Sequence, residues 1–278
     1  MIAIVLALGA SVTWGFADFG AGFASRRLPV FVVTFVMQVA GLVAVALYVW
    51  LTASGRPTWT QVGWAVFAGL AGVVGLSSFY RGLAIGARGI VGPISTTAAL
   101  VPLAYGLSRG ERPSAPQGIG VALAVVGVLG ASLEPQPAGR GRQVGAGVGL
   151  ALLAALGFGC SLIGLSKAAP GGIGWAVLVM RLVAIPCMGV LALGLGVRRP
   201  TRRMLILLVA IGFADTGATL LYAAASTRGL LSIVAVLASL YPVVILALAR
   251  VLLHERVARP QLVGVAVALC GVALVSAG

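Results

Sequence analysis

Residues 111–127 read ERPSAPQGIGVALAVVG, and residues 255–271 read ERVARPQLVGVAVALCG. The two segments share Glu, Arg, Pro, Gln and two Gly residues at identical spacing, 144 positions apart. Weaker matches continue upstream, where Tyr80 and Pro102 correspond to Tyr222 and Pro242. Self-similarity at a fixed spacing indicates a duplicated structural unit. The sequence therefore predicts two homologous halves, residues 1–133 and 144–278, joined by a Pro-, Gly- and Arg-rich linker at 134–143.

The composition is that of a protein embedded in lipid. Hydrophobic residues make up 60% of the chain, charged residues 9%, and the mean hydropathy is +1.13. A soluble domain has about a quarter of its residues charged. Apolar runs of the length that crosses a bilayer follow one another with short polar breaks. They predict ten spans, at residues 2–23, 30–53, 61–80, 90–108, 116–133, 144–166, 172–196, 204–225, 231–250 and 260–277.

The predicted fold class is an all-α membrane protein with ten transmembrane helices arranged as two inverted five-helix repeats. Five spans per half is an odd number, so the second half must enter the membrane upside down relative to the first. Inverted repeats are the architecture of many secondary transporters, with the site near the bilayer midplane. Pro102 and Pro242 occupy equivalent positions in the fourth and ninth spans. Both spans are therefore expected to kink in the same way.

Several function classes are excluded by the same sequence. The net charge is +14, but the basic residues lie between spans, where they anchor helix ends and set topology, so no nucleic-acid partner is expected. The single histidine and three cysteines show no metal-ligand or disulfide spacing. No phosphate-binding loop occurs, so neither ATP nor any other cofactor is predicted. Abundant Ala, Gly, Val and Arg are typical of a bacterial protein, here a multi-pass protein of the inner (cell) membrane, as a monomer or homodimer.

Three charged residues, Asp18, Arg181 and Asp215, lie inside spans. A charge in a bilayer is costly and normally faces a cavity or a partner, which makes these residues the best functional candidates. At 1.5 Å per residue, their distances from the span ends predict one shared central region. Two interpretations of Arg181 stay open: it neutralises Asp215, or it contacts the transported ligand.

Polar and aromatic residues accompany these charges. Trp14 lies one helical turn before Asp18 and hence on the same face. A carboxylate beside an aromatic ring is a typical site for a cationic or amphipathic ligand. Tyr80 and Tyr222 are equally consistent with anchoring at the membrane interface. The predicted substrate- and ion-binding set adds Gln38, Tyr80, Thr96, Thr97, Thr216, Tyr222, Ser239 and Tyr241.

Two five-span units that each end in the duplicated motif resemble the EamA-type domains of the drug/metabolite transporter superfamily. Trp14-Gly15 and residues 80–84 are also similar to that family. The resemblance implies a ten-helix carrier that moves small metabolites, often driven by ion gradients, through a central cavity lined by the first, third, fourth, sixth, eighth and ninth helices. Small multidrug-resistance relatives use one first-helix acid near an aromatic as a shared proton and cation site, and Asp18 resembles that acid.

The orientation in the membrane is predicted differently by two arguments. The resemblance implies cytoplasmic termini. The breaks on the side reached by the first span hold thirteen basic residues outside Arg181, whereas the opposite side holds five. Positive residues favour the cytoplasmic side, which would place the termini outside. We follow the resemblance here and expect cytoplasmic termini.

Three functions compete on these observations. The favoured one is a secondary active transporter that moves a small organic metabolite or drug-like solute by alternating access, coupled to protons or another cation, with export favoured over uptake. A non-transporting membrane scaffold or lipid-handling protein is the alternative. An intramembrane enzyme using Asp18 and Asp215 as an acid pair is a third, but the pattern of intramembrane aspartyl proteases is missing. Glu111 and Glu255 are expected to act structurally, on the N-terminal dipoles of the helices that begin near Pro116 and Pro260.

Overall fold

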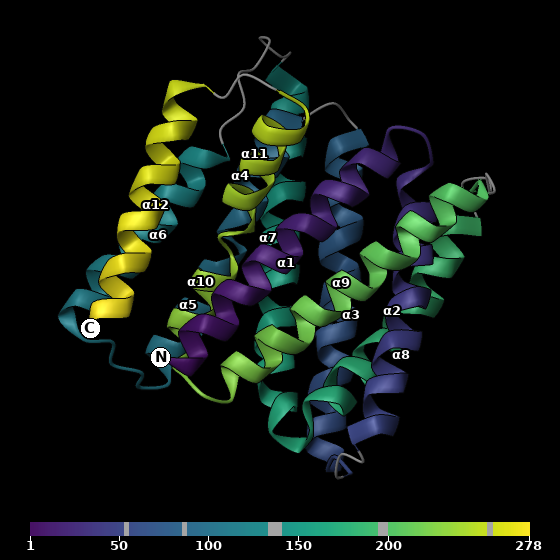
Figure 1. Cartoon of the computed structure of the whole chain (residues 1–278), viewed down its shortest axis with the longest axis horizontal. Helices are drawn as coiled ribbons and strands as arrows, with labels where there is room; N and C mark the ends of the chain where they lie inside the picture. Colours follow the sequence, from purple (N-terminus) through teal and green to yellow (C-terminus); the bar gives the residue numbers. More distant parts are fainter. Residues whose placement is uncertain (53–55, 85–87, 133–140, 194–199, 255–257) are drawn as a thin grey trace.

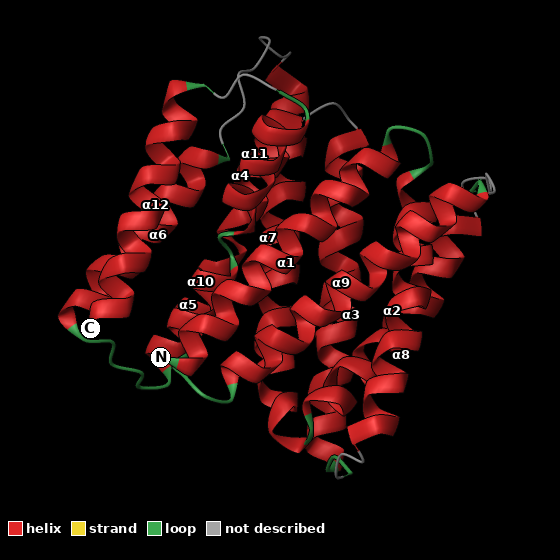
Figure 2. Cartoon of the chain, viewed as in Figure 1, coloured by secondary structure: helices red, strands yellow, loops and turns green. Residues whose placement is uncertain are grey.

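The computed structural model of the 278-residue chain describes every residue except 53–55, 85–87, 133–140, 194–199 and 255–257. All regular structure in the described residues is helical (Figure 2). The helices are α1 (Ile2–Ser25), α2 (Val30–Thr52), α3 (Trp59–Ala84), α4 (Arg88–Ser95), η1 (Thr96–Ala99), α5 (Leu100–Ser108), α6 (Ala115–Ala131), α7 (Gly141–Ala168), η2 (Ala169–Gly171), α8 (Ile173–Leu193), α9 (Arg202–Ser226), α10 (Leu231–Ala238), α11 (Tyr241–Leu252) and α12 (Arg259–Ala277).

The helices lie side by side in a bundle, with α6 and α12 at one edge and α2 and α8 at the other (Figure 1). Helix α1 crosses the middle of the bundle obliquely and packs against α9, α10 and α11. Both ends of the chain lie at the same end of the bundle (Figure 1). The first and last helices therefore start and finish on one side of the protein.

Eight segments of the described chain are long and apolar enough to cross a membrane, and α6 is a shorter apolar helix. Large apolar side chains such as Trp50 (77% exposed) and Val190 (71% exposed) face outward. The core is built largely from small residues, among them Ala7, Ala10 and Ala154. This inversion is expected in lipid, because hydrocarbon does not drive apolar side chains inward and small residues let helix backbones approach closely.

The predicted spans correspond to these helices with two adjustments. The fourth predicted span is divided into α4, η1 and α5, and it is not among the eight long segments. The count of ten spans accordingly stays a prediction. The predicted linker at 134–143 is too long at its end, because residues 141–143 already belong to α7, while 134–140 lie outside the described residues.

The fourth and ninth spans both change their helical geometry near the predicted equivalent prolines. Pro102 is the third residue of α5, after the 3-10 turn η1, and Pro242 is the second residue of α11, after a break at Ser239 and Leu240. Proline has no backbone N–H and its ring collides with the preceding turn, so a helix restarts at such a residue. Both prolines thus lie in the first turn of a helix, and the kink expected of the two spans stays a prediction.

The duplicated motif lies where α6, the last helix of the first half, packs against α12, the last helix of the second half. Helices α6 and α12 cross where glycines face each other. A Cβ added to Gly120 would lie 2.7 Å from the Gly271 carbonyl oxygen, and one added to Gly271 would lie 2.6 Å from the Gly120 carbonyl oxygen. Only residues without a side chain allow this approach. The repeated glycine spacing therefore specifies a close contact between the two copies.

The duplicated glutamines begin these two helices in the same way. Gln117 accepts the backbone N–H of Ser114 at 3.0 Å, and Gln261 accepts the backbone N–H of Ala258 at 3.0 Å. Ser114 also accepts the Gln117 backbone N–H at 3.3 Å, which completes a capping box at α6. These bonds satisfy N–H groups that the first turn of a helix leaves unpaired.

The motif glutamate acts on a different helix from the one expected. Glu111 accepts the backbone N–H groups of Leu231 (2.8 Å) and Ser232 (2.9 Å), so its carboxylate caps α10. The prediction that Glu111 serves the helix beginning near Pro116 is wrong, because Ser114 and Gln117 already occupy that position. Glu111 instead fastens the loop before α6 to the broken helix of the other half. Glu255 lies outside the described residues.

Candidate functional site

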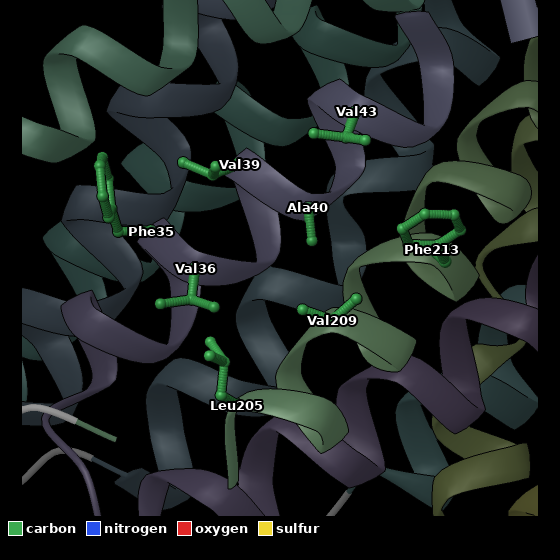
Figure 3. A pocket seen from close by; sticks show the side chains of 8 residues that line it. All are labelled: Phe35, Val36, Val39, Ala40, Val43, Leu205, Val209 and Phe213. Atoms are coloured by element: carbon green, nitrogen blue, oxygen red, sulfur yellow. The ribbon is translucent and has the colours of Figure 1, made fainter. Parts of the chain in front are cut away.

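Two of the cavities that border the described helices have no charged residue in their lining. A groove of about 350 Å³ between α2 and α9 is lined by Phe35, Val39, Phe213 and five other apolar residues (Figure 3). A much smaller cavity of about 10 Å³, close to the volume that holds one water, lies beside η1 and Ser239. The polar chemistry of the spans therefore has to be found from the charged side chains themselves.

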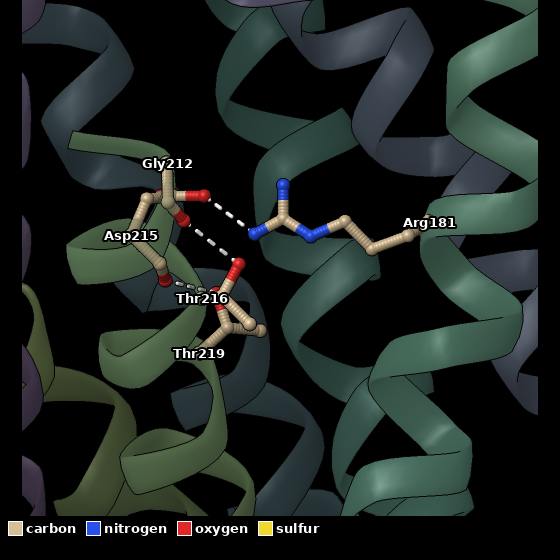
Figure 4. Close-up of polar contacts among 5 residues, drawn as sticks. All are labelled: Arg181, Gly212, Asp215, Thr216 and Thr219. Atoms are coloured by element: carbon tan, nitrogen blue, oxygen red, sulfur yellow. Dashed lines mark hydrogen bonds and ion pairs between the residues drawn. The ribbon is translucent and has the colours of Figure 1, made fainter. Parts of the chain in front are cut away.

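Arg181 and Asp215 form an ion pair between α8 and α9. Arg181 Nη2 lies 2.5 Å from Asp215 Oδ2 (Figure 4). The arginine side chain is 2% exposed and the aspartate side chain is 24% exposed. A buried guanidinium in a membrane needs an anionic partner, and Asp215 supplies it. The interpretation that Arg181 neutralises Asp215 is confirmed.

A glycine of α2 makes room for this pair. A Cβ added to Gly41 would lie 3.0 Å from Arg181 Cζ and would also collide with the Thr216 hydroxyl. Thr216 is buried and donates its hydroxyl to the Gly212 carbonyl at 2.9 Å, while Thr219 donates to the Asp215 carbonyl at 2.8 Å (Figure 4). Thr216 thus packs against the guanidinium, with its proton bound to its own helix.

Asp18 lies close to this pair but differs from it in its surroundings. Its side chain is exposed, whereas Arg181 is buried. At 100° per residue it lies on the side of α1 opposite Phe16, which faces outward. Asp18 and Asp215 are within electrostatic range of each other. Among the described residues, no hydrogen bond or cation fixes Asp18.

Two tyrosines approach the same carboxylates. The Tyr80 hydroxyl lies 3.2 Å from the Thr34 hydroxyl of α2, and Tyr80 is within electrostatic range of both Asp18 and Asp215. Tyr241 begins α11 directly after the break in the ninth span and is within range of Asp18. Both rings are only partly buried. Both tyrosines are therefore partly buried residues within electrostatic range of Asp18.

Trp14 and Tyr222, both predicted to bind the ligand, pack against each other. Their ring centroids lie 5.9 Å apart. Tyr222 is fully buried and donates its hydroxyl to the Leu162 carbonyl of α7 at 3.3 Å. Tyr222 is therefore an interior residue rather than an interface anchor. Trp14, half-buried one turn before Asp18, remains beside the exposed carboxylate.

Gln38 lies on the stripe of α2 that faces these groups. Thr34, Gln38 and Gly41 recur at i, i+4 and i+7, which is one helix face. Thr34 bonds Tyr80 and Gly41 seats Arg181. Gln38 is half-buried between them and forms no hydrogen bond with a described residue. The spacing from Gln38 is the sequence signal that could have added Thr34 and Gly41 to the predicted set.

The remaining predicted hydroxyl residues form a separate group at the helix breaks. Thr96 donates to the Pro93 carbonyl and Thr97 to the Ile94 carbonyl, both at 2.6 Å, and Ser239 donates to the Val236 carbonyl at 2.7 Å. All three line the small cavity, together with residues of α6. The structure brings the three hydroxyls together, but at the breaks rather than with the three charges.

Comparisons with known proteins agree with this architecture. The model of the EamA-like transporter family matches residues 1–133 and again residues 145–277. A solved structure described as "Crystal structure of protein" has a TM-score of 0.82 at 17% identity, covering 98% of this chain and 95% of that one. That identity establishes a shared fold alone. No curated protein matches the sequence. The two family matches together cover nearly the whole chain, which belongs to the EamA-like transporter family of multi-pass membrane proteins.

Proposed function

We propose that the protein is a secondary active transporter that exports a small organic solute by alternating access, with Asp18 as the proton- or cation-binding group. The observation that carries this proposal is the contrast between the two span carboxylates. Asp215 is paired with Arg181, whereas Asp18 is exposed and has no cation beside it among the described residues. A carboxylate without a fixed counter-ion can bind a proton or a cationic ligand in turn, and carriers use intramembrane acids in this way.

The groups around Asp18 support binding of a cationic or amphipathic solute. Trp14 offers an aromatic face, and Tyr80 and Tyr241 offer hydroxyl groups within electrostatic range of the acid. An aromatic face and a carboxylate attract the same positive charge. Gln38 adds an amide without a described hydrogen-bond partner. The predicted binding set thus has its centre at Asp18, with Asp215 and Arg181 as its fixed wall.

The proposed movement takes place at the broken spans of two inverted five-span repeats. Helices α4 and α5 are joined by the 3-10 segment η1, and α10 and α11 are separated by two turn residues, one such site in each predicted half. Discontinuous helices near the midplane are common at transporter sites, where one half rocks against the other. Thr96, Thr97 and Ser239 lie at these breaks, and we assign them to the hinges of the movement.

The proposal is tested first by finding a ligand. Purified protein in detergent is screened against metabolite and organic-cation libraries for compounds that raise the melting temperature with concentration, because a ligand that binds the folded state stabilises it. A hit is then measured at acidic and alkaline pH and in proteoliposomes with an imposed proton gradient. Binding that strengthens as protons are removed, together with gradient-driven uptake into inverted vesicles, supports a coupled exporter.

Two outcomes oppose the proposal. Ligand binding without any gradient-driven flux favours a scaffold or lipid-handling protein. Flux that is unaffected by the proton gradient and by Asp18→Asn removes Asp18 from coupling. A control outside the proposed site is Ser276→Ala, which removes an exposed hydroxyl of α12 that donates to the Val272 carbonyl.

A further inference from the structure

The groove between α2 and α9 is lined by hydrocarbon throughout (Figure 3). On α9 it is bordered by Leu205, Val209 and Phe213, which are 42%, 38% and 44% exposed. Both helices are among the segments long and apolar enough to cross a membrane. The groove therefore opens toward lipid. Its volume of about 350 Å³ lies in the range of small-molecule sites.

One end of the groove carries a positive charge. Arg202, Leu205, Val209 and Phe213 recur at i, i+3, i+7 and i+11 of α9, so the arginine lies on the same helix face as the groove. Arg202 is exposed and precedes Leu205 by roughly 4.5 Å along the axis. The groove then extends roughly 12 Å further, to Phe213. The positively charged Arg202 thus lies at one end of the apolar groove.

The helix itself adds to this positive potential. Arg202 and Arg203 occupy the first turn of α9, where the aligned peptide dipoles already favour anions. Thr201 accepts the Met204 N–H at 3.4 Å, which leaves the two preceding N–H groups of the turn for another acceptor. Exposed Arg27 precedes α2, which begins at the same end of the bundle as α9 (Figure 1). This end of the groove is suited to a phosphate.

We infer that the α2–α9 groove binds an anionic phospholipid, with one acyl chain along Val39, Val209 and Phe213 and the phosphate at Arg202. Such a lipid joins hydrocarbon and negative charge in one molecule, which is the combination that the groove presents. A zwitterionic lipid would bring an ammonium group to the arginines. A second copy of this chain is a poorer occupant, because the whole sequence has five acidic residues and two of them are inside spans.

The position of the groove connects it to the ion pair. Ala40 lines the groove, and the next residue, Gly41, faces the Arg181 guanidinium. A Cβ added to Gly212 of α9 would lie 2.9 Å from the Ala40 side chain, so the helices are in close contact there. The contact between α2 and α9 has the groove on its outer side and Arg181 on its inner side. A lipid in the groove therefore stabilises the contact that positions Arg181.

The test compares lipid retention and thermal stability. Protein delipidated in detergent is mixed with phosphatidylglycerol or phosphatidylcholine of the same acyl composition, and bound lipid is counted by native mass spectrometry. Four variants are compared: Arg202→Gln and Val209→Trp at the groove, and Arg259→Gln and Val263→Trp as controls. Arg259 is exposed at the start of α12, and Val263 is a 62% exposed valine of the same helix.

The wild type should retain phosphatidylglycerol preferentially and gain melting temperature from it. Arg202→Gln should reduce the preference over phosphatidylcholine roughly fivefold, the contribution of one basic residue near an anionic headgroup. Val209→Trp should lose both lipids because it fills the groove, while the two α12 variants retain the wild-type preference. Equal retention of both lipids by the wild type, or an equal loss in Arg259→Gln, would overturn the inference. So would a change of oligomeric state, without a change of lipid content, in Val209→Trp.

Discussion

Arg181 Nη2 lies 2.5 Å from Asp215 Oδ2, while Asp18, within electrostatic range of Asp215, is exposed and has no such partner among the described residues. The two acids of the predicted spans are therefore unequal. One is paired with Arg181 between α8 and α9, and the other has no cation beside it among the described residues. We therefore expect substitution of Asp18 to alter the pH dependence of ligand binding and substitution of Asp215 to alter folding.

Asp18→Asn should leave the protein folded but make ligand binding independent of pH. The carboxamide has nearly the same shape and cannot release a proton, and among described residues no ion pair is broken by the change. Thermal shifts of the variant with a ligand from the screen are measured at acidic and alkaline pH. Proton-coupled transport by Asp18→Asn at the parental rate would contradict this role.

Asp215→Asn should damage folding, because it leaves a buried guanidinium without its anion. Removing one partner of a buried ion pair costs about 3–5 kcal/mol. The double variant Asp215→Asn with Arg181→Gln removes both charges and should recover part of that loss. Denaturation midpoints in detergent provide the measurement. If the double variant were less stable than Asp215→Asn alone, Arg181 would stabilise the protein by some interaction other than its ion pair with Asp215.

Gly41→Ala should disturb the same pair from α2. The added methyl group would collide with the Thr216 hydroxyl and would lie 3.0 Å from Arg181 Cζ, so Thr216 has to move and the guanidinium has to adjust with it. We expect a lower melting temperature and weaker ligand binding. Gly217→Ala is the matched control, because a Cβ at that α9 position meets nothing within 4 Å and alanine favours helix over glycine by about 0.5–1 kcal/mol. Equal effects of the two substitutions would argue against a specific role of Gly41 in leaving space for the Arg181 guanidinium.

Glu111→Gln should lower stability more than it lowers affinity. The carboxylate accepts N–H groups of both Leu231 and Ser232 at the positive end of α10, and a neutral amide has one acceptor oxygen. Loss of a helix cap costs about 0.5–2 kcal/mol. Gln117→Ala, which removes the internal cap of α6, is a comparison of similar size within one half. Normal stability with lost binding in Glu111→Gln would place this residue in the site instead. We expect the same loss of stability for Glu255→Gln, because Glu255 occupies the position of Glu111 in the second copy of the motif.

Reporter fusions at Gly278 should place the carboxyl terminus in the cytoplasm. A cytosol-dependent fluorescent reporter is expected to shine there, and alkaline phosphatase is expected to be inactive. The thirteen-to-five distribution of basic residues favours the opposite result. Active phosphatase without fluorescence would show that charge, rather than family likeness, decides the orientation.

The sequence by itself determines the helices and where two of them break. Hydropathy depends on neighbours along the chain, so apolar runs locate the spans to within a few residues. Pro102 and Pro242 act through their own missing N–H groups and rings, so their effect is also local. The pairing of Arg181 with Asp215 could be anticipated because an unpaired charge is costly in a bilayer and depth follows from residue count.

Tertiary structure alone decides which faces of these helices meet. The rotation of each helix about its axis depends on all of its neighbours, and in lipid the small residues that set it are distributed throughout the sequence. For this reason Glu111 caps α10 of the other half instead of its own helix, and Gly41 becomes the seat of Arg181. For the same reason Tyr222 is fully buried while Asp18 is exposed, because the packing of neighbouring helices encloses one side chain and leaves the other uncovered.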